Sequence, residues 1–222
     1  MKKLIKPIAI TLGVLIAILM IGRATGMLTY YSIPTPNMDP TLKVGDHILT
    51  SNLLSYERGN VVCFKYPFSE TGDIYVKRLC AIGGDEIQMK RGVLYVNGEN
   101  FDEKLDLKHL YVVSKDDYHQ LLSKQELEEH DQAMGGLHGD SALVFIRDAL
   151  ARDLGYHHKM TGPGSDFDVT TFGAGNHNNF GPVTIPEDML LMLGDNRDNS
   201  YDSRMWGYCP EENYRGKVIA IF

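Results

Sequence analysis

The sequence is poor in cysteine and in positive charge, and each shortage excludes a class of protein. Three cysteines among 222 residues, Cys63, Cys80 and Cys209, are too few and too scattered for a disulfide framework or a zinc motif. One pair could form a disulfide, but three small buried apolar residues are the simpler expectation. Acidic residues outnumber basic ones by 29 to 22, for a net charge of −7, which argues against a nucleic-acid-binding surface.

A metal-binding motif, an internal repeat and a low-complexity tract are also missing. The eight histidines include His157, His158 and His177 in a Gly- and Asn-rich stretch, without the His-x-x-x-His spacing that places two ligands on one face of a helix. We therefore expect no bound metal. Acidic residues gather between Asp102 and Asp153, which is typical of a solvated surface rather than a site.

The longest uncharged run lies near the N-terminus and predicts a membrane anchor over residues 1–29. Three lysines precede an apolar run from Pro7 to Gly22, which Arg23 closes. As a helix these residues span about 24 Å, slightly short of a bilayer core of roughly 30 Å, and apolar neighbours can extend them. A cleaved signal peptide is the alternative, but no Ala-x-Ala-like site follows the run. The excess of lysine before the run places the N-terminus inside the cell and the rest outside.

Short apolar runs separated by turn residues predict antiparallel β-structure on both sides of a central stretch. Ser32–Leu42 carries three prolines and should be extended or turning rather than helical. Asn97-Gly98 is typical of a hairpin turn. Strands are expected at His47–Ser51, Asn60–Tyr66, Asp73–Ile82, Val93–Asn97, Val183–Leu193 and Gly216–Phe222.

The central stretch, residues 102–182, predicts a cap inserted into this β scaffold. Ser114 with Asp117 three residues later forms a capping box that starts a helix ending at about Glu129. A second helix is expected over Ser141–Leu154, where apolar residues recur on one helical face. Thr161–Pro182 is rich in Gly, Asn and Asp and should be a loop. We interpret the insertion as a solvated elaboration without chemistry.

The polar segment Gly194–Gly207 is the most unusual part of the sequence, since it places two arginines and three aspartates beside residues that should be buried, Leu191–Leu193 and Trp206. Charges beside a core need partners, so we expect pairing within the segment, of Asp195 or Asp202 with Arg197 or Arg204. Such a network could be purely structural, or it could support a neighbouring site.

Lys77 is the next unusual residue, because it precedes Arg78 inside a strand-like run, Ile74–Ile82. Side chains alternate along a strand, so one of these two cations must point toward the interior or a cleft. A lysine in an apolar cleft loses its proton readily, and the neutral amine can act as a general base toward a serine. A lysine on an edge strand explains Lys77 equally well.

Taken together, the boxes Ile33–Leu42, Tyr75–Asp85 and Gly194–Gly207 resemble those of type I signal peptidases, membrane-anchored serine–lysine endopeptidases that remove signal peptides from exported proteins. The resemblance covers the anchor and most of the chain outside the insertion. It implies a mostly β fold, with antiparallel sheets or a barrel of the signal peptidase type, an inserted α-containing cap and an N-terminal transmembrane helix. The catalytic-type domain would comprise residues 30–101 and 183–222, and no cofactor is needed.

The resemblance also implies roles for individual residues. Lys77 matches the general base, and Ser200 matches the hydroxyl that orients it. Thr35 falls where the family places a hydroxyl that stabilises the oxyanion, beside the backbone N–H of residue 37. Asp202 and Arg204 match an ion pair that supports the site. The implied partners are membrane lipid and the signal peptides of exported preproteins, with small residues at −1 and −3 and docking by strand addition. The implied location is the bacterial cell membrane, crossed once with the N-terminus cytoplasmic.

Asn37 departs from the family pattern, because it stands where the family has its nucleophilic serine. An asparagine amide has no ionisable hydroxyl and cannot form an acyl-enzyme. Its oxygen could instead accept a hydrogen bond from Lys77 and favour the protonated amine. Two functions follow: a signal peptidase that has lost cleavage, or a non-catalytic member that serves as a binding or assembly chaperone for exported or pilus-type substrates. A self-cleaving repressor shares the chemistry, but the N-terminal span argues against it.

Overall fold

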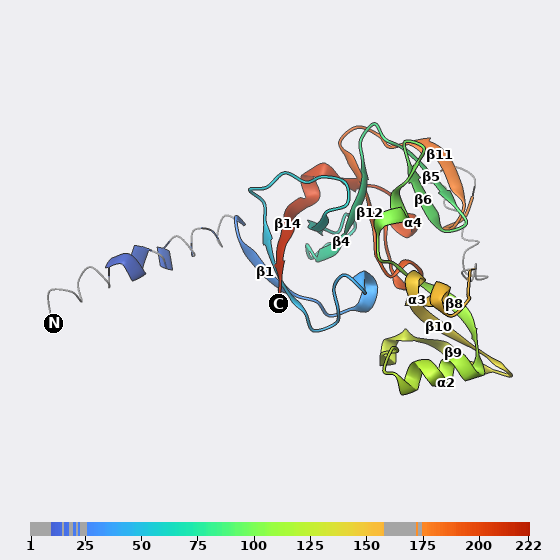
Figure 1. Ribbon diagram of the computed structural model, residues 1–222. Coiled ribbons are helices and arrows are strands. Elements are labelled where there is room, and N and C mark those ends of the chain that lie inside the picture. Colours follow the sequence, from blue (N-terminus) through green and yellow to red (C-terminus); the bar gives the residue numbers. More distant parts are fainter. Residues whose placement is uncertain are drawn as a thin grey trace, which may run out of the picture.

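The computed structural model describes residues 10–14, 16–17, 20, 22, 26–157, 172 and 175–222, with the backbone alone for Gln132–His138. Its strands form three antiparallel sheets, so the prediction of a mostly β fold is confirmed (Figure 1). The large sheet contains, in spatial order, β1 (Thr29–Ser32), β2 (His47–Ser51), β14 (Tyr214–Ile221), β3 (Val61–Lys65), β4 (Ile74–Ile82), β12 (Met189–Leu193) and β13 (Cys209–Pro210).

Two smaller sheets flank the large one. The first has four strands, in the order β11 (Phe180–Thr184), β5 (Glu86–Lys90), β6 (Val93–Val96) and β7 (Glu99–Asn100). The second has three, in the order β8 (Lys108–Ser114), β10 (Ser141–Arg147) and β9 (Gln132–His138). Among the residues described after position 26, the helices are α2 (Lys115–Ser123), α3 (Asp148–Asp153) and α4 (Ser203–Trp206). Short 3-10 turns are η1 (Pro36–Met38), η2 (Phe101–Lys104), η3 (Glu129–Asp131), η6 (Arg197–Asn199) and η7 (Glu211–Asn213).

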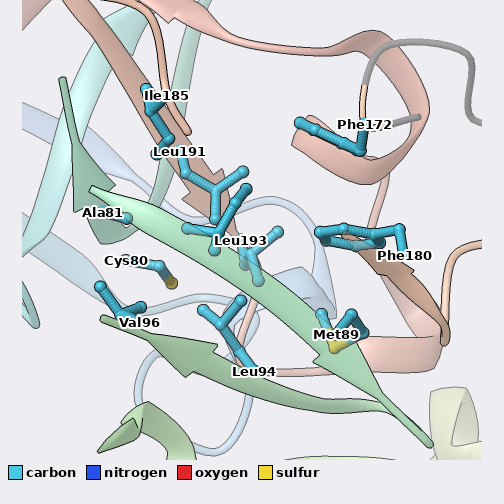
Figure 2. Packing of buried hydrophobic residues seen from close by; sticks show 11 residues of the cluster. Cys80, Ala81, Met89, Leu94, Val96, Phe172, Phe180, Ile185, Leu191 and Leu193 are labelled. Atoms are coloured by element: carbon cyan, nitrogen blue, oxygen red, sulfur yellow. The ribbon is translucent and has the colours of Figure 1, made fainter. Parts of the chain in front are cut away.

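Strand β12 shows why an uninterrupted apolar run becomes a strand here. Leu191 and Leu193 pack against the four-stranded sheet in one core cluster, which Figure 2 shows. Leu190 and Met192 point to the opposite side and pack in a second cluster with Trp206. Because both faces of β12 are covered, the strand is apolar at every position instead of alternating. This packing holds the polar segment that follows β12 directly against the core.

The predicted anchor, residues 1–29, lies largely outside the described residues. Those described between positions 10 and 22 are helical, and Thr29 begins β1. Within the part of the chain that the structure describes, no helix is long and apolar enough to cross a membrane.

The β-scaffold follows the expected strands closely. The hairpin between β6 and β7 turns at Asn97-Gly98, where both residues adopt positive φ, 53° and 81°, as a two-residue turn requires. Ser32–Leu42 contains only the single turn η1 and is otherwise non-helical. The expected strand Val183–Leu193 is wrong as one element, because β11 ends at Thr184 and β12 begins at Met189, in different sheets. All three cysteines are free and buried, as expected.

The insertion differs more from its prediction. Helix α2 begins as expected, with the Ser114 hydroxyl accepting from the Asp117 amide, but it ends at Ser123 rather than near Glu129. The second expected helix is wrong: Ser141–Arg147 is strand β10, and α3 covers only Asp148–Asp153. Residues 142, 144 and 146 are buried in alternation with their neighbours, so the period is two rather than 3.6.

The inserted segment has a core of its own and also reaches the β-scaffold. Tyr111, Leu121 and Val144 are among the buried residues that join β8, α2 and β10. The loop expectation for Thr161–Pro182 is wrong at its end, where Phe180 begins β11; most of that range lies outside the described residues. The expectation of a solvated acidic surface is also wrong for Asp102 and Asp131, which are buried and ion-paired.

Candidate active site

A cavity of about 450 Å³ lies beside the first half of β4 and collects residues from all three boxes. Thr35 and Asn37 reach it from the loop around η1, Tyr75 and Lys77 from β4, and Tyr201 from the segment after β12. The structure thus brings positions 35 and 37 together with position 77, which is 40 residues further along the chain than Asn37. Tyr75 and Tyr201 were not singled out beforehand as site residues, since exposed or strand tyrosines carry no distinguishing pattern.

Asn37 lies in η1, a turn that its apolar neighbour fixes in place. Met38 is fully buried in a cluster with Ile33 and Leu42. The Asn37 amide nitrogen donates to the Thr35 hydroxyl at 2.8 Å. The Asn37 amide oxygen is buried and accepts no hydrogen bond from any residue that the structure describes. The hydrogen bond considered between this oxygen and Lys77 is therefore not formed.

Lys77 is buried in the middle of the large sheet. Strand β4 lies between β3 and β12, although β12 pairs only with its residues 78–82. Because Lys77 is buried rather than exposed at an edge, the interpretation of Lys77 as an edge-strand lysine is wrong. Its side chain is 1% exposed, and its ammonium nitrogen lies 5.9 Å from the centre of the Tyr75 ring. Burial lowers the pKa of Lys77 to about 8; Asp202 opposes this shift and Arg204 adds to it. The amine can therefore accept a proton near neutral pH.

Ser200 and Asn37 both lie close to Gly194, which packs against the Ser200 hydroxyl and the Asn37 backbone carbonyl. A Cβ atom on Gly194 would come within 2.2 Å of the Ser200 hydroxyl oxygen and 2.5 Å of the Asn37 carbonyl oxygen. A side chain at position 194 would therefore push these two residues apart. The Ser200 hydroxyl is buried without a hydrogen-bond partner among the residues described, so the hydrogen bond expected between Ser200 and Lys77 is not formed.

Asn196 holds the backbone of η1 from the opposite side. Its amide N–H donates to the Asn37 carbonyl at 3.2 Å, and its side chain donates to the Pro36 carbonyl at 3.2 Å. These two contacts fix the orientation of the peptide at residue 37. Sequence reasoning missed Asn196, because only its neighbouring charges drew attention to that segment.

Buried charge pairs surround the segment after β12, and only one of them lies within it. Arg204 donates to the Asp202 carboxylate at 2.8 and 2.9 Å, one of the pairs expected from the sequence. Asp195 instead pairs with Arg78 at 2.5 and 2.7 Å.

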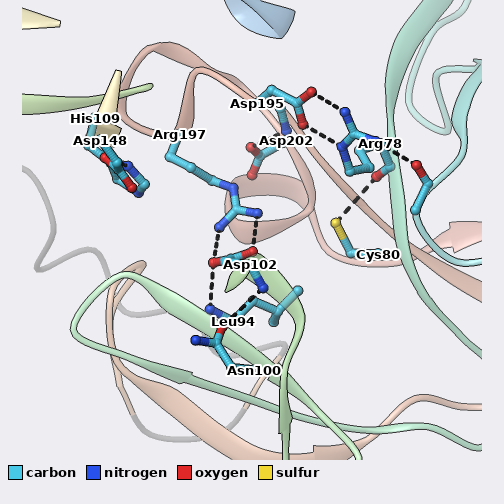
Figure 3. A network of polar contacts seen from close by, with 12 residues as sticks. Arg78, Cys80, Leu94, Asn100, Asp102, His109, Asp148, Asp195, Arg197 and Asp202 are labelled. Atoms are coloured by element: carbon cyan, nitrogen blue, oxygen red, sulfur yellow. Dashed lines mark hydrogen bonds and ion pairs between the residues drawn. The ribbon is translucent and has the colours of Figure 1, made fainter. Parts of the chain in front are cut away.

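Arg197 pairs with Asp102 at 2.5 and 2.6 Å, as Figure 3 shows. The pairing expected within the segment is thus formed by Asp202 and Arg204, and the alternatives through Asp195 and Arg197 are not formed. Both find partners that are distant in sequence.

Arg204→Ala is expected to destabilise the protein strongly, because it leaves the Asp202 carboxylate, which is fully buried, without its counter-charge. Removing one partner of a buried pair costs on the order of 3 kcal/mol, which for a chain of this size lowers the melting temperature by about 6–12 °C. Thermal unfolding followed by circular dichroism measures the shift. The control is Arg152→Ala, which removes an exposed arginine from α3; equal shifts for the two variants would show that the Asp202–Arg204 pair contributes no more than a surface charge.

Comparison with known proteins identifies the family. The model of the family described as signal peptidase, peptidase S26, matches residues 2–222. Signal peptidase I of Aquifex aeolicus (strain VF5) is 31% identical over 209 residues, covering 86% of this chain and 74% of that protein. Signal peptidase IB of Staphylococcus aureus (strain COL) is 31% identical over 233 residues, covering 100% and 91%. A crystal structure of a signal peptidase I from Enterococcus faecalis V583 covers 75% of this chain at 19% identity, with a TM-score of 0.37.

The chain belongs to the signal peptidase, peptidase S26, family. The family match extends across the anchor region, both parts of the β-scaffold and the insertion.

Proposed function

We propose that this chain is a signal peptidase I-type protein that binds the N-terminal signal peptides of exported preproteins and, with asparagine at position 37, does not cleave them appreciably. The observation that carries the proposal is the shared cavity of Asn37 and Lys77. Lys77 is buried with a pKa of about 8, so the base is present. The neighbouring side chain at position 37 has no hydroxyl to give up a proton.

The remaining parts of the site fit an endopeptidase that acts after small residues at −1 and −3. Lys77 would be the general base, and Ser200 would orient it once a substrate or a side-chain rotation brings the two into contact. The Thr35 hydroxyl and the N–H of residue 37 would stabilise the oxyanion. The buried pair of Asp202 and Arg204 would support the floor of the site.

The substrate would dock by strand addition along the first half of β4. Strand β12 pairs with β4 only at residues 78–82, whereas β3 pairs with residues 74–78 on the other side. Backbone groups alternate in direction along an antiparallel ladder, and Leu79 directs its N–H and C=O toward residues 59 and 60. Val76 therefore directs its own toward the cavity, where an extended peptide can pair with them.

The apolar lining of the cavity supports a preference for small side chains. Pro34, Pro36, Ile74 and Val76 face the space in which the peptide would lie. Small side chains at −1 and −3 would fit in the space between β4 and the loop of Pro34 and Pro36. The site would lie at the outer surface of the bacterial cell membrane, with one anchoring span, contact with lipid and a cytoplasmic N-terminus.

The alternative is a non-catalytic binding or assembly chaperone for exported or pilus-type substrates. The contact that favours it is the hydrogen bond that the Asn37 amide donates to the Thr35 hydroxyl, which holds the asparagine side chain in place at the nucleophile position. Both proposals share the same groove, and they differ in whether a hydroxyl at position 37 is sufficient for cleavage.

Binding without cleavage is the first expected result for the unmodified chain. A fluorescent peptide with an apolar stretch and alanine at −1 and −3 should bind to the full chain in detergent micelles, as measured by fluorescence anisotropy. Mass spectrometry of the same mixture should recover the peptide intact. The control peptide carries phenylalanine at −1 and −3 and should bind more weakly. Equal affinity for the two peptides would show that the groove along β4 is not the binding site.

A further inference from the structure

A buried ion cluster connects the insertion to the loop that carries residue 37. The Lys108 cluster consists of Asp39, Lys108, His130 and Asp131. The Lys108 ammonium donates to the Asp39 carboxylate and, at 2.6 Å, to Asp131. His130 approaches Asp39 at 3.4 Å. Asp39, Lys108 and Asp131 are all buried, so each of these charges depends on the others for its stabilisation.

Lys108 already provides the cation of this cluster. Ligand-type atoms of Asp39, His130 and Asp131 lie within 4.8 Å of one another, an arrangement that could hold a metal ion. The Lys108 ammonium, however, contacts both carboxylates. A protein side chain therefore supplies the positive charge that both acids contact, and the cluster acts as a link between two chain segments.

The first segment in this link is the loop of residue 37. Asp39 follows η1 directly, and its N–H donates to the Pro36 carbonyl at 3.1 Å. Between Asp39 and Asn37 lies only Met38, which is fully buried. A movement of the Asp39 side chain would therefore be transmitted through the short turn to position 37.

The second segment is the one that follows β12. The backbone N–H of Lys108 donates to the Asp195 carbonyl at 3.0 Å, and Lys108 forms a parallel bridge with Asn196. Asn196 in turn donates to the carbonyls of Pro36 and Asn37. Lys108 thus contacts the loop of residue 37 through its side chain and the polar segment through its backbone.

We infer that Lys108 is a positioning residue: through Asp39 and Asn196 it fixes the orientation of residue 37 toward Lys77, so the insertion contributes to the geometry of the site. Without the ammonium, Asp39 and Asp131 would be two buried carboxylates facing each other, and repulsion would turn Asp39 toward solvent. The turn η1 would then shift, while the peptide groove along β4 would remain. For its effect on cleavage, this inference rests on the proposed function.

The kinetic test uses the Asn37→Ser background. Lys108→Met keeps the length of the side chain and removes its charge, and kcat for a signal peptide substrate is expected to fall about tenfold or more, because small displacements of a reacting group slow the chemical step. KM should stay within about twofold, since β4 binds the peptide. Lys108→Arg retains the charge and should recover most of kcat. The matched control is Lys43→Met, which breaks an exposed pair between the loop after η1 and Glu128 of the insertion.

A second readout does not depend on cleavage. In the unmodified chain, Lys108→Met should accelerate hydrogen exchange of the Asp39 and Leu42 amides, which donate within the loop at 3.1 and 2.9 Å, and leave exchange in β5 and β6 unchanged. Asp39→Asn keeps the shape of its side chain and removes only the charge; combined with Lys108→Met it abolishes the repulsion from Asp131 and should reverse the local effect. If Asn37→Ser does not cleave signal peptides, the proposed function fails, and hydrogen exchange alone then tests whether Lys108 positions the loop of residue 37. Exchange that rises throughout the protein, or that matches Lys43→Met, would overturn the positioning role.

Discussion

Asn37→Ser is expected to give this chain signal-peptide cleavage, and Asn37→Ser combined with Lys77→Ala is expected to lack it. A serine at position 37 would place a hydroxyl in the cavity that Lys77 also lines. Lys77 could then remove its proton, and the resulting alkoxide could attack the peptide carbonyl. Removing one member of a nucleophile–base unit typically costs about 10⁶-fold in rate, so the gain on restoring the serine should be of that order.

Asn37→Ala is the control that separates two effects of the asparagine: the missing nucleophile and the hydrogen bond that its amide donates to Thr35. Alanine releases the Thr35 hydroxyl from its hydrogen bond with the Asn37 amide but supplies no nucleophile, so this variant should stay inactive. Mass spectrometry of the peptide products gives both the rate and the cleavage position. If the unmodified chain already cleaves at a rate comparable to Asn37→Ser, another nucleophile acts, and Thr35 is the first to replace. If Asn37→Ser folds normally and stays inert, the chaperone alternative is favoured.

The candidate site residues that line the cavity could be predicted, because each belongs to a short sequence motif that stands out from its neighbours along the chain. Lys77 stands out in an apolar strand, and the polar segment after β12 stands out beside buried leucines. The sequence could not show that Ser200 makes no hydrogen bond with Lys77, since that depends on a side-chain rotation inside a packed segment. It also could not show that Lys77 belongs to a central strand, because strand order depends on long-range pairing.

The charge network could not be predicted for a related reason. Arg197 pairs with Asp102 across 95 residues, and Lys108 reaches Asp39 across 69. The sequence offers many acidic residues for each basic one, and for Arg197 the acids nearby in the sequence were not its partner.

The helix prediction for residues 141–147 was wrong for a different reason. Their apolar positions fit both the helical and the strand period, and pairing with β8 and β9 makes them a strand. The insertion, interpreted from the sequence as a solvated elaboration, contacts the segment after β12 through Lys108.

The cleavage rate of Asn37→Ser is expected to rise with pH and to level off above about 8. Lys77 must be neutral to accept a proton, and burial lowers its pKa to about 8. Below that pH the neutral fraction falls about tenfold per unit, so kcat/KM should be about a thousandfold lower at pH 5 than at pH 8. Initial rates measured in a series of buffers at constant ionic strength give the profile. A profile that is flat between pH 5 and 8 would exclude Lys77 as the base.

The same burial predicts how Lys77 affects stability, which tests the pKa without any catalysis. Below pH 8 the lysine is protonated in both the folded and the unfolded chain, and the full cost of burying its charge is present. The pKa of Lys77 is about 8 in the folded chain and has its ordinary value of 10.5 in the unfolded chain. Between these two pH values the unfolded chain still binds the proton that the folded chain has released, so the stability of the fold rises with pH. A shift of this size corresponds to about 3 kcal/mol.

Lys77→Met should therefore raise the melting temperature at pH 7, and the gain should shrink as the pH passes from 8 to 10.5. A destabilised Lys77→Met at pH 7 would mean that the ammonium is stabilised in the folded protein, in which case it could not serve as a base near neutral pH.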